Sequence, residues 1–176
     1  MLPITTVLRA ICVPLAALAV AASTFAGHVP SAGAAAFAPM SAPEYQFLDE
    51  LNADRAANGL APVVANDVLS GLAHERSQQI LASGLFSHYD AAGKLVFAGM
   101  LDGAGFPYLF AGENLAENNV RSLQDSMNEA NAQLMNSPEH RANILNSRFD
   151  QVGIGIAGPA AGGQFYYTEI FAQTAS

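Results

Sequence analysis

The chain has 176 residues, 51% of them hydrophobic, a formal net charge of −8 at pH 7 and a single cysteine. Seven Lys and Arg residues stand against fifteen Asp and Glu. This balance excludes a nucleic-acid partner, because binding to phosphates needs a basic face. One cysteine also excludes an internal disulfide framework, so the core alone must hold the fold together.

The first 36 residues have the pattern of a secretory signal peptide. Arg9 is the only charged residue before Glu44, and an apolar run follows it at 11–27. The small residues of 31–36 then offer A-x-A cleavage sites. We therefore predict that residues 1–36 are removed as a signal peptide and that the mature protein is secreted to the extracellular side.

A retained membrane anchor is the alternative to a cleaved signal. The run 11–27 approaches the roughly 17 to 25 residues that a spanning helix needs. Pro14, the many alanines and the cleavage sites favour removal, so no stable membrane span is expected afterwards. Removal also takes Arg9 and Cys12, which leaves six basic against fifteen acidic residues and a formal charge of −9. A mature chain without cysteine has no thiol nucleophile and no thiolate zinc site.

The remaining roughly 140 residues suit a single domain. Residues 37–43 are mostly small and include two prolines, which predicts a flexible lead-in, and the domain is expected to cover 44–174. A first helix is predicted from Glu44 to the glycine cap at Gly59. Its helical spacing is carried by Tyr45, Leu48, Leu51 and Arg55.

Further helices are predicted along the middle of the chain. Asn66 should cap a second helix that ends at Gly84, with an inward face of Leu69, Leu72, Ala73, Ile80 and Leu81. A short helical piece is expected at 96–101. A longer helix at 122–135 should bury Leu123, Met127, Ala130 and Leu134. Ser137 and Pro138 then favour the start of a short helix that ends at Leu145.

The last part of the chain has the pattern of a β-hairpin. Residues 152–156 and 164–171 alternate at period two around a turn rich in glycine and proline. Helices therefore come first and strands last, without βαβ units. This order predicts an α+β domain in which helices cover an antiparallel sheet.

Several motifs, in this order along the chain, resemble the bacterial branch of the CAP superfamily, which comprises the cysteine-rich secretory, antigen 5 and pathogenesis-related 1 proteins. The matching stretches are Leu51-Asn-Ala-Asp-Arg55 with Gly59-Leu-Ala-Pro62, Phe86-Ser-His88, Gly112-Glu-Asn-Leu-Ala116, Ser137-Pro-Glu-His-Arg-Ala-Asn-Ile-Leu145 and Val152-Gly-Ile-Gly155. Their joint order covers nearly all of 44–173. The resemblance implies a three-layer α-β-α sandwich with a small antiparallel sheet and a cleft lined by histidines and acids.

The resemblance also implies the residues of the cleft. His88 and His140 match the two cleft histidines, and Glu113 matches the glutamate of the Gly-Glu-Asn motif. A second cleft acid of eukaryotic relatives aligns loosely with Glu129. The chain departs from bacterial relatives at Leu134, near the usual place of a tryptophan, and at Glu139, where glycine is common.

Two imidazoles and a carboxylate are a workable ligand set for a divalent metal such as zinc, which keeps a fourth position for water. Metal-bound water could attack a carbonyl, with Glu113, Glu139 or Glu129 as candidate base. The spacing is no local ligand motif, since roughly 25 residues separate successive members. His88 could instead simply end a helix-to-loop transition as a surface group, and Glu113 could satisfy backbone donors of a turn.

Other polar residues predict no further catalytic group. Arg141 and Asn143 are interpreted as structural, bonding backbone carbonyls across to the sheet. His74 and Glu75 begin like a zincin helix, but Gln78 stands where the second histidine must be, so His74 is interpreted as an exposed helix residue. No G-x-S-x-G elbow accompanies Ser87 or Ser137.

Three functions compete for this domain. The favoured one is an extracellular binding module for a small amphipathic ligand, a lipid or sterol, or for an extracellular protein. The second is a metal-dependent hydrolase that uses the histidine and glutamate cleft. The third is a purely structural envelope protein. Fold resemblance carries most of the preference for binding over catalysis.

Overall fold

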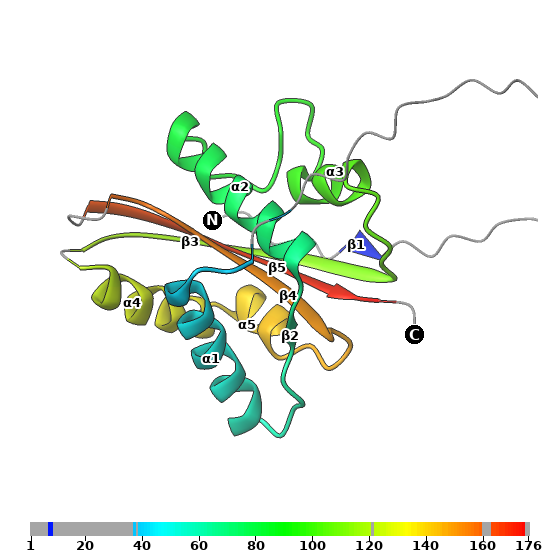
Figure 1. The fold of residues 1–176 in the computed structure, drawn as a ribbon, viewed down its shortest axis with the longest axis horizontal. Coiled ribbons are helices and arrows are strands. Elements are labelled where there is room, and N and C mark those ends of the chain that lie inside the picture. The colour runs from blue at the N-terminus through cyan, green and yellow to red at the C-terminus, as the bar shows by residue number, and fades with distance from the viewer. Residues whose placement is uncertain (1–6, 9–36, 38, 121, 160–162, 175–176) are drawn as a thin grey trace, which may run out of the picture.

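The computed structural model describes residues 7–8, 37, 39–120, 122–159 and 163–174 (Figure 1). Its helices are α1 (Ala42–Ala57), α2 (Asp67–Ser83), α3 (Val96–Gly103), α4 (Leu123–Asn136) and α5 (Pro138–Ile144). Its strands are β1 (Val7–Leu8), β2 (Val64–Ala65), β3 (Phe110–Val120), β4 (Gln151–Ala157) and β5 (Gly163–Gln173). None of the described helices combines the length and apolar character that a membrane crossing requires.

The strands form one sheet in the order β1-β3-β5-β4-β2. The pairs β3–β5 and β4–β5 are antiparallel, which confirms the predicted hairpin, whereas β2 runs parallel to β4. The sheet is therefore mixed and centred on β5. Helices α2 and α3 cover one face, and α1, α4 and α5 cover the other, as Figure 1 shows. This arrangement confirms the three-layer α-β-α sandwich.

Two apolar clusters fill the spaces between the sheet and the helix layers. The larger lies under α1, α4 and α5 and includes Phe47, Leu51, Leu134, Tyr167 and Phe171. The smaller lies under α2 and α3 and includes Leu69, Leu72, Phe97, Leu101 and Ile170. Side chains of a strand alternate between the faces, so neighbouring residues of β5 serve opposite layers.

The predicted ends of α2 are confirmed. The Asn66 side chain accepts hydrogen bonds from the backbone of Val68 and Leu69 at 3.0 and 3.2 Å, and Gly84 ends the helix with φ 68°. Of the predicted inward face, Leu69, Leu72, Ala73 and Ile80 are buried. Leu81 is 39% exposed, so its assignment to the core was wrong. The inward stripe instead continues through the polar residues Arg76 and Ser77, both buried.

The helix α1 begins two residues earlier than predicted. Glu44 accepts the Ser41 backbone N–H at 2.7 Å, a reciprocal cap that fixes the first turn. Part of the segment 37–43, expected as a flexible lead-in, is packed, because Met40 is only 6% exposed and Phe37 contacts the α2 layer. The predicted signal peptide lies outside the described residues except for Val7–Leu8, which pair with β3.

Arg55 fastens the end of α1 to the chain that follows α5. Its guanidinium donates to the backbone carbonyls of Ala61 (2.9 Å), Ile144 (2.6 Å), Asn146 (3.0 Å) and Phe149 (3.3 Å). The side chain is 1% exposed. This is the role that the sequence suggested for Arg141, whose exposed side chain donates no hydrogen bond within the described part of the chain. The residue was misassigned because the partners of an arginine are decided by tertiary packing, which the local sequence does not show.

The helix α2 lies directly on the glycines of β4. A Cβ placed on Gly153 would come within 2.0 Å of the Leu69 carbonyl carbon, and one on Gly155 within 2.2 Å of that of Ala73. The hydroxyl of Ser77 donates toward the Gly155 carbonyl at 2.9 Å and contacts the Thr168 hydroxyl at 2.8 Å. On one face of β4, Ile154 therefore packs into the cluster under α1, α4 and α5. On the other face, the glycines allow the backbone of α2 to lie directly on the strand.

This close approach predicts a strong asymmetry between two glycine substitutions. Gly155→Ala should lower the free energy of unfolding by about 2 kcal/mol or more, because the new methyl group meets backbone that cannot move independently. Gly99→Ala in α3 is the matched control. Its Cβ would meet no atom within 4 Å, and alanine stabilises a helix by up to about 1 kcal/mol over glycine. Urea denaturation measures both changes, and equal stabilities of the two variants would contradict this packing.

Candidate functional site

The outer edge of β3 is the floor of a cavity of about 880 Å³. Among the described strands, only β1 pairs with this edge, at Phe110 and Ala111. The loop at 86–89 approaches the open part of the edge from the α2 side, and α4 and α5 approach from the other side. The lining residues are Phe86, Ser87, His88, Tyr89, Leu115, Ala116, Glu117, Glu129, Ala132, Gln133, Leu134, Asn136, Ser137, Pro138, Glu139 and His140.

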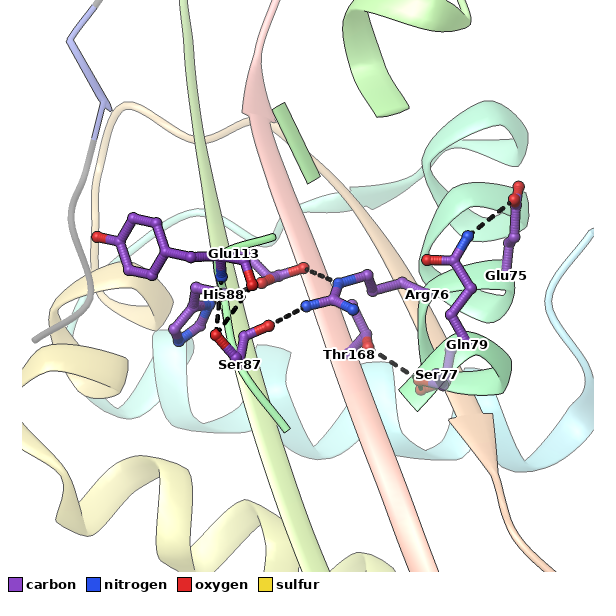
Figure 2. Close-up of polar contacts among 10 residues, drawn as sticks. Glu75, Arg76, Ser77, Gln79, Ser87, His88, Glu113 and Thr168 are labelled. Carbon is purple, nitrogen blue, oxygen red and sulfur yellow. Dashed lines mark hydrogen bonds and ion pairs between the residues drawn. The ribbon is translucent and has the colours of Figure 1, made fainter. Parts of the chain in front are cut away.

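Next to the cavity, behind His88, the carboxylate of Glu113 is held between the side chains of Arg76 and His88. Arg76 Nε donates to Oε1 at 3.1 Å, and His88 Nδ1 lies 2.6 Å from Oε2. Figure 2 shows the three side chains converging from α2, the following loop and β3. Glu113 is 1% exposed and the Arg76 side chain 5% exposed. Burial makes this pairing necessary, because an isolated buried carboxylate is strongly destabilising.

The contact with Glu113 determines how His88 presents its ring. A carboxylate accepts hydrogen bonds, so Nδ1 of His88 carries the proton and donates it. The other ring nitrogen, Nε2, does not take part in this contact and is available to groups in the cavity that His88 lines. Such carboxylate-histidine pairs fix the tautomer and orientation of functional imidazoles.

Arg76 is the residue of this site that sequence reasoning missed. Besides binding Glu113, its Nη2 donates to the backbone carbonyl of Ser87, the residue before His88. It therefore positions both the carboxylate and the loop. A signal was present, because Arg76 lies three and four residues after Ala73 and Leu72 and four before Ile80, on the buried face of α2. An arginine within an apolar stripe indicates a buried partner.

His140 reaches the same cavity from α5, on the opposite side of β3. Burial lowers its pKa to about 4, with a further contribution from nearby His88 that outweighs the opposing effect of Glu139. The imidazole of His140 is therefore neutral at physiological pH. Its backbone carbonyl accepts a hydrogen bond from Asn114 Nδ2 at 3.1 Å, which ties the start of α5 to β3.

A buried polar network joins α5 to the strands β3 and β5. Asn114 donates to Glu169 Oε2 at 2.8 Å and accepts from Asn143 Nδ2 at 2.9 Å. The structural role predicted for Asn143 is thus confirmed. Glu169 has no exposed surface, and its Oε1 has no hydrogen-bond partner among the described residues. Burial raises the pKa of Glu169 to about 7, against the lowering effect of the Asn114 hydrogen bond.

The structure brings the predicted site residues together in part. His88 and His140 both line the cavity, as do the exposed carboxylates of Glu129 and Glu139. Glu113 touches His88 from behind and is not a lining residue.

Ser137 begins α5, but its hydroxyl contacts Glu139 Oε2 at 3.2 Å and does not cap the helix. His74, expected to be exposed, is 52% exposed and lies 3.2 Å from Glu44.

The predicted metal ligands fit a metal ion only in part. Both oxygens of Glu113 accept hydrogen bonds, and the residue lies behind His88 and does not line the cavity, so this carboxylate orients His88 and does not face an ion in the cavity. The rings of His88 and His140 supply two nitrogen donors. Within the described ranges, no group of three or more His, Cys, Asp or Glu side chains converges closely enough to hold an ion. A complete structural zinc site takes four ligands, and a catalytic one takes three from the protein.

The chain belongs to the cysteine-rich secretory protein (CAP) family, whose family model matches residues 48–171. It is 34% identical over 116 residues to the uncharacterized protein YkwD of Bacillus subtilis (strain 168). That match covers 66% of this chain and 43% of the relative. The chain therefore spans less than half the length of this curated relative.

Solved structures show the same fold. An extracellular protein containing an SCP domain from Bacillus anthracis str. Ames has a TM-score of 0.64 and 21% identity, and the match covers 78% of this chain and 45% of that protein. An outer surface protein from Borrelia burgdorferi also has a TM-score of 0.64, at 16% identity, with 78% of this chain and 98% of that protein covered. Proteins of the extracellular space thus share this sandwich.

The buried carboxyl of Glu169 predicts a pH-dependent stability difference. Its pKa rises from the ordinary 4.5 to about 7 on folding, so above pH 4.5 the unfolded chain releases a proton that the folded chain retains. The folded state therefore loses stability as pH rises from 4.5 to 7, by about 3 kcal/mol in total. Glu169→Gln should abolish this loss.

The measurement is the difference in unfolding free energy between Glu169→Gln and the wild type at several pH values. His140 acts in the opposite direction over part of this window, since its lowered pKa costs stability as pH falls from 6.5 to 4, but it is present in both proteins. The difference should move in favour of the variant from pH 4.5 to 7. Glu75→Gln, at an exposed position of α2, is the control, and a constant difference for Glu169→Gln would contradict the assignment.

Proposed function

We propose that this chain is a secreted CAP-domain protein that works as an extracellular binding module. Its cavity beside His88 and His140 would hold a small amphipathic ligand, such as a lipid or sterol, or the matching part of an envelope or host partner. The observation that carries this proposal is a cavity of about 880 Å³ whose lining surface is largely apolar and which includes the side chains of His88 and His140. Ligand sites in proteins have this size and composition.

The residues around the cavity support binding over covalent catalysis. Phe86, Leu115, Leu134 and Pro138 present apolar surface from four different segments. Phe86 is 39% exposed. A ligand that packs against this large aromatic side chain would bury apolar surface and gain binding free energy. The hydroxyl of Ser87 donates to the Tyr89 carbonyl at 3.1 Å and accepts from its N–H at 3.0 Å, which commits it to the turn. A serine held in this way is poorly placed as a nucleophile.

Blocking the cavity tests the binding function. Cholesterol delivered from cyclodextrin and monolaurin, a neutral acylglycerol, should each be screened for a rise in the melting temperature, because a ligand stabilises the native state that it binds. At least one should raise it by several degrees. Ala132→Trp, at an exposed position of α4 that lines the cavity, should remove the shift. Ala53→Trp, on an exposed position of α1, is the matched control.

Two results would count against a binding module for neutral amphiphiles. One is the absence of any shift with the wild type. The other is an equal shift in Ala132→Trp and Ala53→Trp, which would place the ligand elsewhere on the surface.

A metal-dependent hydrolase is the second candidate, and the contact between His88 and Glu113 favours it. Histidines that bind metals commonly donate their second ring N–H to a carboxylate, as His88 does here. A bound divalent ion such as zinc would supply an acidified water when present. The residues of this chain would contribute two imidazoles, His88 and His140, with Glu129 and Glu139 exposed nearby.

Zinc titration calorimetry separates the two candidates. Because no third ligand converges with the two imidazoles in the described part of the chain, we expect no zinc binding at one ion per chain, and the His88→Ala and His140→Ala variants should titrate like the wild type. Uptake of one zinc per chain that is lost in both variants would favour the hydrolase and contradict the expectation that the two imidazoles alone do not hold an ion.

A further inference from the structure

Three exposed glutamates in the lining of the cavity, which together define what we call its mouth, have no lysine or arginine beside them among the lining residues. Glu117 on β3, Glu129 on α4 and Glu139 on α5 all line the cavity, and all three are exposed. None of the lining residues is a lysine or an arginine. Three elements of the fold thus bring carboxylates to one cavity, whose lining surface is otherwise largely apolar.

The hydrogen-bond partners of these carboxylates are neutral. Glu117 accepts from the side-chain amide of Gln164 at 3.2 Å, and Glu129 accepts from that of Gln133 at 3.0 Å. Glu139 lies 3.2 Å from the Ser137 hydroxyl. Within the part of the chain that the structure describes, no ion pair forms at any of the three.

The buried guanidinium of Arg76 does not line the cavity and does not offset this charge. Arg76 donates to the Glu113 carboxylate and to the Ser87 carbonyl, so its guanidinium is used behind His88 and away from the opening. The chain as a whole is also negatively charged, with a formal net charge of −8. A ligand that carries a carboxylate or sulfate would bring further negative charge to this place, which costs binding free energy.

From this combination we infer that the cavity selects amphipathic cations, meaning an apolar chain or ring system with an ammonium group. The apolar part would lie against Leu115 and Leu134, and the ammonium group would lie at the mouth, within reach of the glutamates. Phe86 adds an aromatic face that also favours a cation. The inference rests on the proposed binding function and specifies the charge of the ligand.

The size of the effect follows from the exposure of the carboxylates. Ion pairs at exposed positions are individually weak and are screened by salt. Two or three acting on one ammonium group should together favour the cation by about tenfold over a neutral head group at low ionic strength. An anionic head group on the same tail should bind more weakly than the neutral one.

The experiment compares three ligands that share a twelve-carbon tail: dodecyltrimethylammonium, dodecanol and dodecanoate. Each is titrated into the full chain below its micelle concentration or, for dodecanol, below its solubility limit. The titrations are run at low salt and again with 0.5 M NaCl, which compresses the Debye length to a few ångströms (about 3 Å at 1 M). We expect the cation to bind about tenfold more tightly than dodecanol at low salt, with dodecanoate weakest. High salt should reduce this preference.

Two double variants test whether the mouth is responsible. Glu117→Gln with Glu129→Gln removes two carboxylates from the cavity and should reduce the preference for the cation, with dodecanol binding unchanged. Asp49→Asn with Glu75→Gln removes the same charge at exposed positions of α1 and α2 outside the lining, and should leave the preference intact.

The outcomes separate the two proposals. If dodecanol and dodecanoate bind as tightly as the cation, the selection for cations is wrong and the amphipathic binding function stands. If the control variant loses the preference as fully as the cavity variant, the effect comes from net charge and the inference is again wrong. If none of the three ligands binds, both proposals fail.

Discussion

The buried carboxylate of Glu113 is the interaction on which the candidate site depends. It sits in β3, where three parts of the chain that are distant in sequence come together, and it is removed from water. A charge in that position is tolerated only with close partners, and Arg76 and His88 supply them. The same pairing that makes the carboxylate acceptable therefore holds the His88 ring and the loop before it against the sheet. Stability and site geometry come from one set of contacts.

The position of β3 at the sheet edge explains why a cavity lies beside this carboxylate. One helix layer contributes the loop with His88, the other contributes α5 with His140, and each reaches around the strand toward the same open edge. The network of Asn114, Asn143 and Glu169 anchors α5 as Arg76 anchors the loop. Rigid support beneath both histidines, with an apolar space between them, suits a preformed binding site.

Much of the fold could be predicted from local signals. Asn66 and Gly84 bounded α2 correctly, because capping depends on residues a few positions apart. The strand β3 was not assigned, since its buried residues include Glu113 and Asn114 and hide the usual apolar alternation. Leu81 and Arg141 were misplaced, because a helix stripe and an arginine's partners are decided by tertiary packing, here by Arg76, Ser77 and Arg55.

The site itself was predictable only as a set of residues. Family resemblance indicated His88, Glu113 and His140, but it could not show that Glu113 faces Arg76, since the two are 37 positions apart on different elements. The role of a carboxylate, whether ligand or support, depends on which side chains it faces and on whether it reaches the cavity, and Glu113 does not line the cavity. Likewise, the acidic mouth emerges only when β3, α4 and α5 are placed around one opening.

Nitrogen NMR of the histidine rings tests the support of His88 by Glu113 most directly. In the chain labelled with ¹⁵N, long-range couplings distinguish a protonated Nδ1 from a protonated Nε2 in each imidazole. The contact with the Glu113 carboxylate requires that Nδ1 of His88 carries a proton at pH 7. A neutral ring with its only proton on Nε2 would show that Glu113 does not hold His88 as described, and the basis of the site would be lost.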